Sequence, residues 1–224
     1  MIKSFLSLIF LVSTTSAFSY AVDFSVPTNL TQLNCLRAAS YETVLTRIFN
    51  SDGSVDKNGI QTMSLIQKNK MLMNVYGYLT PQANVGNGSV QVEKTYEALT
   101  KSGIQFETLY IQIARYTSTW SSDTSANLQF ILDMCNRARF YGKSVGIYSS
   151  FSDWVAITGN VKTLVPNLAL WYYDVHGPGV TGESQPNLND FVAFGPFKKS
   201  MVRFKQFAMV ENVCGVDLNR DIVV

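Results

Sequence analysis

The sequence has little charge and no long apolar run after its first residues. Its 18 Lys and Arg and 16 Asp and Glu residues make up 15% of the chain and leave a formal net charge of +2. Nucleic acid is therefore not the expected partner, because it requires a clustered basic face. After residue 17 no stretch approaches the roughly 20 apolar residues that a spanning helix needs. No membrane span is expected.

The sequence also lacks the usual signatures of metal and nucleotide sites. Its only histidine, His176, lies in the turn-like run HGPG, without Cys or acidic neighbours at ligand spacing, so we expect no metal site. Neither GxGxxG nor GxxxxGK[ST] occurs, which removes the main dinucleotide and phosphate fingerprints. We expect no cofactor.

The first 17 residues have the composition of a secretory signal peptide. Lys3 precedes an apolar segment from Phe5 to Val12, and small residues end at Ala17, which suits the cleavage rule. We expect residues 1–17 to be removed and residues 18–224 to form a single extracellular domain, because α/β barrels of about 200 residues are often undivided. The sequence predicts no particular oligomeric state.

The three cysteines would then lie in a compartment where disulfides persist. An odd number allows at most one bridge within the chain. We expect Cys35 to pair with Cys214, because a closed barrel would bring the first helix near the last strand; the alternative is that these two and Cys135 are all small buried apolar groups. Asn29 and Asn87 each begin an N-glycosylation sequon.

Strand-like and helix-like segments alternate over the first two thirds of the chain. The expected strands are 20–25, 41–49, 71–79, 106–113 and 144–150, and the clearest helices are 58–70, 92–101 and 124–140. Such alternation predicts parallel pairing through right-handed crossovers. Two further strand-like segments, 167–175 and 201–208, are separated by runs rich in Pro, Gly and Asn. We therefore predict an α/β barrel with an irregular last third, in preference to an open doubly wound sheet.

In parallel barrels the ligand site lies at the carboxyl ends of the strands. The expected strand ends present mostly aromatic and amide side chains: Asp23, Arg47, Tyr76, Tyr78, Gln112, Ala114, Tyr148, Trp171, Tyr172, Asp174, Lys205 and Gln206. This lining suits sugar rings, which stack on aromatic faces and offer hydroxyls for hydrogen bonds. Tyrosines at strand ends are also common as plain packing.

Several segments together resemble glycoside hydrolase family 25, the Chalaropsis-type lysozymes, and most closely the nematode lysozyme-like proteins. The segments are YAVDFS, CL before the second strand, GIYSSFSDW, LALWYYDV and KQFAMVENVCGVDLN, and they span nearly the whole chain after residue 17. The resemblance implies an irregular TIM-like barrel of about five βα units followed by three strands with few helices. It also implies peptidoglycan or a related amino-sugar polymer as the partner.

The residues that carry catalysis in that family are absent. The family's fourth strand ends in D-x-E, in which the glutamate donates a proton and the aspartate supports the reacting sugar. By position this pair falls on Gln112 and Ala114, whereas aspartates from strand one and from the C-terminal VDxN segment are retained as Asp23 and Asp217. Glycoside cleavage usually takes two carboxyl groups. Gln112 cannot titrate and Ala114 has no proton to give, so we assign no catalytic residue.

We therefore expect a lysozyme-like pseudoenzyme that keeps a glycan-binding groove but has lost most or all hydrolysis. The expected groove residues are Asp23, Tyr76, Tyr78, Gln112, Tyr148, Trp171 and Asp217. A role in innate defence or in digesting bacteria follows only by analogy, which is weak support for function.

Two alternatives stay open. The first is an active glycosidase with relocated acids, for which Asp174, just past the sixth strand, is the best-placed candidate. Glu107 is excluded, because it lies about 23 Å back along the fourth strand. The second is a non-carbohydrate interaction protein on the same fold. Arg115, which follows Ala114, either enters the emptied groove or remains solvated at its rim.

Overall fold

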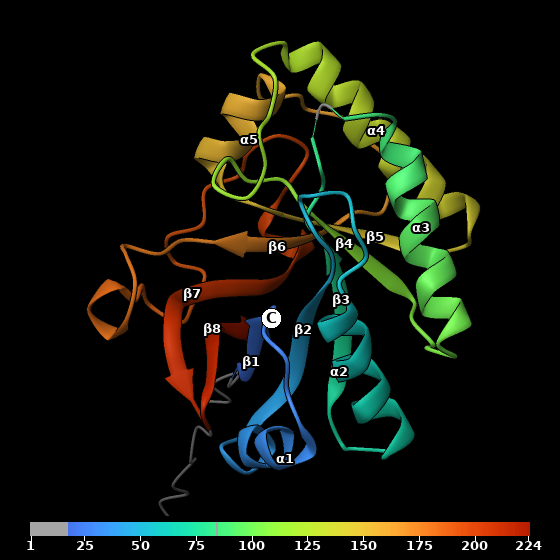
Figure 1. Ribbon diagram of the computed structural model, residues 1–224. Helices are drawn as coiled ribbons and strands as arrows, with labels where there is room; N and C mark the ends of the chain where they lie inside the picture. The colour runs from blue at the N-terminus through green and yellow to red at the C-terminus, as the bar shows by residue number, and fades with distance from the viewer. Residues whose placement is uncertain (1–17, 84) are drawn as a thin grey trace, which may run out of the picture.

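The computed structural model describes residues 18–83 and 85–224, and in them eight strands close into one barrel (Figure 1). The strands are β1 (Ser19–Phe24), β2 (Tyr41–Phe49), β3 (Asn74–Leu79), β4 (Thr108–Gln112), β5 (Ser144–Ser149), β6 (Ala169–Tyr173), β7 (Val202–Val213) and β8 (Val216–Val223). The helices are α1 (Leu30–Ala38), α2 (Lys57–Lys68), α3 (Gly88–Lys101), α4 (Thr124–Phe140) and α5 (Phe151–Thr158), with short 3-10 turns at Val180–Gly182 and Lys199–Met201. The expected signal peptide lies outside the described residues.

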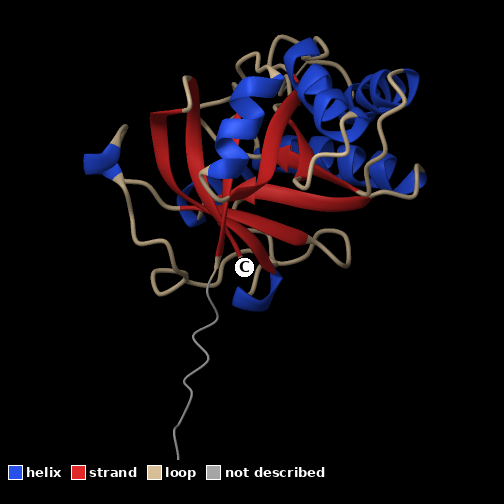
Figure 2. Ribbon diagram, turned by 90° about the horizontal axis from the view of Figure 1, so that it is seen from below, coloured by secondary structure: helices blue, strands red, loops and turns tan. Residues whose placement is uncertain are grey.

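The barrel has the order implied by the resemblance. Strands β1 to β7 pair in parallel in chain order, and β8 closes the barrel by pairing antiparallel with both β7 and β1. Five βα units are thus followed by three strands, so the expected fold is confirmed. The helices lie outside the strands (Figure 2), and the connection from β6 to β7 consists of loops with the two short 3-10 turns.

Each α-helix begins at a polar side chain that accepts a backbone N–H of the first turn. The N-cap residues are Asn29, Asp56, Asn87, Asp123 and Ser150. Such caps each stabilise a helix by about 1 kcal/mol. Asn29 and Asn87, the two predicted glycosylation positions, are exposed, and their modification stays a prediction.

Two layers of apolar side chains hold the barrel together. The outer layer packs the helices on the strands, with residues such as Ile131 and Met134 of α4 fully buried against Ile111 of β4. The inner layer fills the barrel and is largely aromatic, which includes Tyr110 and Trp171. No helix among residues 18–83 and 85–224 has the length and apolar character to cross a membrane.

A disulfide ties α1 to the hairpin formed by β7 and β8. Cys35 of α1 is bonded to Cys214, which lies in the two-residue turn of the hairpin, with Cα atoms 5.9 Å apart. Both turn residues have positive φ, 57° at Cys214 and 71° at Gly215, as tight hairpin turns require. This is the pair expected from barrel closure, and Cys135 is a buried free thiol in α4.

Two elements were not found from local pattern. Helix α5 has only eight residues, too few to show an apolar stripe, and β8 follows only from the resemblance, which implies a third strand after the five βα units. The segment 216–223 does alternate: Val216 and Leu218 are buried toward α1, whereas Asn219 and Asp221 face the barrel side. Asp221 of this strand, which lies beside Asp23, is therefore not among the site residues predicted from the sequence.

Candidate functional site

Three small cavities open at the carboxyl ends of the strands, and Asp23 lines two of them. The mouth cavity, of about 340 Å³, is lined by Asp23, Arg47, Ser51, Tyr78, Thr80, Gln112, Tyr116, Thr117, Met209 and Asn219. The loop cavity, of about 550 Å³, lies between residues 115–121 and α5 and shares Ser51, Tyr116 and Thr117 with the mouth cavity. A third cavity, of about 170 Å³, joins Asp23 to Asp217. Together the three form the candidate groove.

Two buried carboxyl groups lie side by side beneath the groove. Asp23, at the end of β1, accepts hydrogen bonds from Asn219 Nδ2 at 3.0 Å and from Gln206 Nε2 at 3.2 Å. Asp221 of β8 is fully buried and accepts from Trp171 Nε1 at 2.7 Å. The two carboxyl groups are close enough to hydrogen-bond to each other, which requires that they share a proton.

Burial controls the charge of this pair. Removal from water raises the pKa of Asp23 to about 7, although hydrogen bonds from Asn219 and Asp221 partly offset the effect. Burial, followed by the charge of Asp23, raises the pKa of Asp221 well above its usual range. Two adjacent carboxylates in a site without water cannot both be ionised cheaply, so one proton stays on the pair at neutral pH.

The carboxyl pair makes the stability of the protein depend on pH. The folded pKa of Asp23 is raised, so its contribution is full below the unfolded pKa of about 4 and is lost as pH rises through about 7. In Asp221→Asn, the new amide can donate to Asp23 and still accept from Trp171. From pH 5 to pH 8 we expect the free energy of unfolding of wild type to fall by on the order of 2 kcal/mol more than that of this variant.

Thermal and urea unfolding at pH 5 and pH 8 measure this difference. Asp217→Asn on the same strand is the matched control, because Asp217 is exposed and bonded only to Asn212. Equal pH dependence in wild type and Asp221→Asn would contradict the shared proton.

The two positions of the missing acids are fixed by neighbours. Gln112 Oε1 accepts from Thr80 Oγ1 at 2.7 Å. Ala114 is fully buried among the aromatic residues inside the barrel, and its carbonyl accepts from Thr117 Oγ1 and Trp120 Nε1 at 3.1 and 3.0 Å. Gln112 lines the mouth cavity, but Ala114 is sealed from it.

A tyrosine that the sequence analysis did not select covers this region. Tyr116 is 59% exposed, yet its hydroxyl points inward and bonds to that of Tyr148. Tyr148 in turn donates to Gln206, which donates to Asp23. A chain of four polar groups thus runs from the groove surface to the carboxyl pair, and burial raises the pKa of Tyr116.

Three expected sugar-stacking residues require correction. Tyr76 lines a different cavity, of about 700 Å³, at the amino ends of the strands beside Thr108 and Ser144. Strand β3 begins at Asn74, so Tyr76 lies early in the strand and far from the groove. Trp171 and Tyr148 are 0% and 1% exposed. They fill the barrel below the groove, where a sugar cannot reach their faces. Tyr78 does line the mouth cavity.

The proposed substitute acid also faces the wrong way. Asp174 follows Tyr173, whose side chain points inward to Tyr148; the Asp174 carboxyl therefore lies on the outer side, hydrogen-bonded to Asp190 near Lys205. Burial and Asp190 raise the pKa of Asp174. His176 is an exposed loop residue, and Glu107 lies at the opposite end of β4, as expected.

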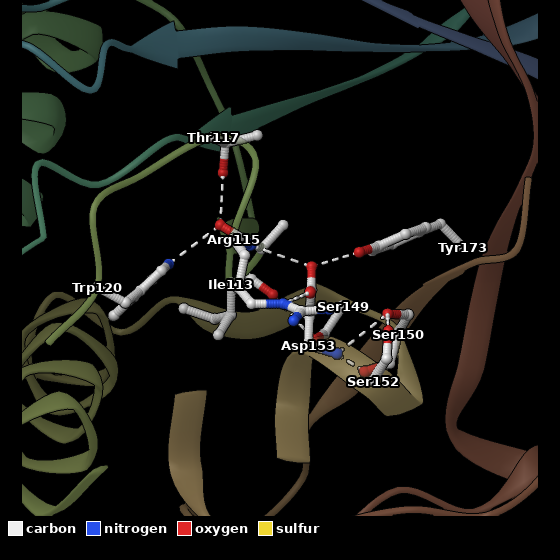
Figure 3. A network of polar contacts seen from close by, with 10 residues as sticks. Ile113, Arg115, Thr117, Trp120, Ser149, Ser150, Ser152, Asp153 and Tyr173 are labelled. Atoms are coloured by element: carbon white, nitrogen blue, oxygen red, sulfur yellow. Dashed lines mark hydrogen bonds and ion pairs between the residues drawn. The ribbon is translucent and has the colours of Figure 1, made fainter. Parts of the chain in front are cut away.

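Arg115 remains at the rim, held by a buried acid (Figure 3). Its Nε donates to Asp153 Oδ1 at 2.6 Å and its backbone N–H to Asp153 Oδ2 at 3.1 Å. Tyr173 also donates to Asp153, which lies in the first turn of α5. The pair with Asp153 raises the pKa of Arg115. Within the described residues no cluster of three potential metal ligands occurs.

Comparisons with known proteins identify relatives over most of the chain. Residues 14–207 match the family described as Lysozyme-like protein 1. Lysozyme-like protein 1 of Caenorhabditis elegans is 38% identical over 95% of this chain and 71% of its own length. A probable GH family 25 lysozyme of Dictyostelium discoideum is 28% identical over 92% and 91%. The muramidase from Trichobolus zukalii has the same fold, with a TM-score of 0.67, 17% identity, and coverage of 92% and 93%.

Proposed function

The chain belongs to the lysozyme-like family of glycoside hydrolase family 25 type, and from this premise we propose that it binds peptidoglycan or a related amino-sugar polymer with little or no hydrolysis. The observation that carries the proposal is the end of β4. The resemblance assigns the two acids of the family to positions that hold Gln112 and Ala114 in this chain, and Ala114 is fully buried. A proton donor worth typically 10²–10⁴-fold in rate is missing there.

The groove keeps groups that suit a sugar polymer. Tyr78, Thr80, Gln112 and Asn219 border the mouth cavity together with Asp23. Hydroxyls and amides can both donate to and accept from sugar hydroxyls. The polymer would thus be held at the strand ends, above the carboxyl pair.

We further propose that the protein acts outside the cell. The composition of residues 1–17 supports export, and the disulfide between Cys35 and Cys214 suits an oxidising compartment. Defence against bacteria, or their digestion, is the role that the family suggests.

The test is to incubate the purified chain with insoluble peptidoglycan and measure two quantities. We expect the protein to sediment with the polymer, and reducing ends to be released at least 100-fold more slowly than by an active muramidase. Sedimentation with neither peptidoglycan nor chitin by the folded protein would favour a non-carbohydrate partner instead.

A second candidate, slow hydrolysis, is favoured by the position of Asp23, a carboxyl group that lines the mouth cavity. The pKa of Asp23 is raised to about 7 by burial, which suits a group that donates a proton at neutral pH. Reducing ends released by wild type and abolished in Asp23→Asn, with Asp174→Asn unchanged, would establish this function.

A further inference from the structure

Two arginines border the groove, and both are anchored in the same way. Arg47, near the end of β2, lines the mouth cavity, and Arg115, just past β4, lines the loop cavity. Arg47 Nε donates to Asp56 at 2.9 Å, and Arg115 Nε donates to Asp153 at 2.6 Å. Because the cavities share Ser51, Tyr116 and Thr117, both arginines face one continuous space.

The acids that hold these arginines are themselves committed to other donors. Asp56 is the N-cap of α2 and accepts from Asn58 N–H through its other oxygen. Asp153 accepts from the Arg115 backbone and from Tyr173, and lies in the first turn of α5. The positive end of a helix dipole partly neutralises each carboxylate. Each ion pair therefore leaves part of the positive charge of the arginine available to a ligand.

This arrangement leaves one edge of each guanidinium available. In both arginines the Nε side is fixed, and the Nη atoms have no hydrogen bond to a described residue. The Arg115 side chain is 58% exposed and that of Arg47 is 31% exposed. A planar fork already held in position loses little freedom when it binds a carboxylate through two parallel N–H···O bonds.

We propose that Arg47 and Arg115 bind carboxylate groups of the polymer, so that the groove selects a carboxylate-bearing glycan over an uncharged one. This inference rests on the proposed function and narrows its substrate class. In peptidoglycan the free carboxylates belong to the peptide stems, because the lactyl carboxyl group of a sugar that carries a stem is bound in the amide to it. A lactyl carboxylate is free only on a sugar without a stem. Chitin has the same type of amino sugar but no carboxylate.

The test compares one polymer in two charge states. Wild-type protein is titrated with peptidoglycan freed of phosphate polymers, and with the same preparation after its carboxylates are converted to carboxamides. We expect amidation to weaken binding about tenfold, as loss of a charged hydrogen-bonded pair would. Glycan strands from which an amidase has removed the stems carry free lactyl carboxylates in their place. Binding as tight as that of the native polymer would show that the arginines accept a lactyl carboxylate, and weaker binding would show that they require the carboxylates of the stems.

Variants assign the effect to the two arginines. Arg115→Gln and Arg47→Gln should each bind native peptidoglycan several-fold more weakly, and neither should change binding to the amidated polymer. If the glutamine variant is unstable, Arg115→Lys replaces it in the test, because lysine keeps a positive charge beside Asp153. This variant should retain part of the preference for native over amidated peptidoglycan. Arg139→Gln, an exposed arginine of α4, is the matched control.

Equal affinity of wild type for native and amidated peptidoglycan would overturn this inference and leave the proposed function intact. Binding to neither polymer would overturn the proposed function as well.

Discussion

Replacing Cys35 and Cys214 together with serine is expected to lower the free energy of unfolding by about 3–5 kcal/mol. The two residues are 179 positions apart in sequence, so the bond closes a loop that includes nearly the whole domain. The entropy that a cross-link removes from the unfolded chain grows with loop length. A domain whose total stability is about 5–15 kcal/mol would lose a large part of it.

The structure gives this bond a local role as well. Gln32 Nε2 donates to the Gly215 carbonyl at 3.0 Å, and Leu33 and Leu36 pack against Val216 and Leu218. The disulfide thus holds α1 on the tip of the hairpin that carries Asp217 and Asn219 into the groove. We expect the serine variant to lose glycan affinity in addition to stability.

Urea unfolding with and without a reducing agent measures the effect. Wild type under reducing conditions should approach the double variant, which should itself respond little to reduction. Cys135→Ala removes the buried free thiol and should leave the response to reduction unchanged. Unfolding of the double variant at the wild-type urea midpoint would contradict the expectation.

The fold was predictable because long elements have strong patterns. The bounds of α4 and β2 match the expected segments 124–140 and 41–49, since a 17-residue apolar stripe and a nine-residue β-branched run leave few alternatives. Strand β8 is not evident from local pattern because Arg220 interrupts the apolar face that Val216, Leu218 and Ile222 form. Asn219 and Asp221 lie on the opposite face, toward the polar groups of the site.

The sequence predicts the residue types of the site, but it does not predict how deep their side chains lie in the barrel. Asp23, Tyr78 and Gln112 do meet at one cavity, because the carboxyl ends of parallel strands lie at one end of the barrel. The sequence does not reveal how far along its strand a side chain enters the interior. The side chains of Tyr76 and Trp171 do point into the barrel, but they lie too far from the groove to contact a sugar. Tyr116 reaches the site from a loop, where no periodic pattern predicts its direction.

Restoring the missing acids is expected to restore hydrolysis only if Tyr116 is also removed. Ala114 is fully buried against Tyr148, and the Tyr116 hydroxyl bonds to Tyr148 above it. A glutamate at position 114 needs space and must contact the sugar. Tyr116 occupies that space and prevents the contact. We therefore expect little activity from Gln112→Asp with Ala114→Glu, and about 10²-fold more when Tyr116→Ala is added.

The matched control for the triple variant places glutamine in position 114, with Gln112→Asp and Tyr116→Ala kept. It has the same shape and hydrogen-bonding reach but no proton to donate, so it should stay inactive while binding peptidoglycan equally well. A glutamate at 114 would lie in a buried site, where desolvation raises the pKa of a carboxyl group toward the range that a general acid needs. Release of reducing ends should therefore fall as pH rises above that pKa. If the glutamate and glutamine forms fold and bind alike but release reducing ends equally slowly, then the absence of the proton donor does not account for the low rate of hydrolysis that we propose.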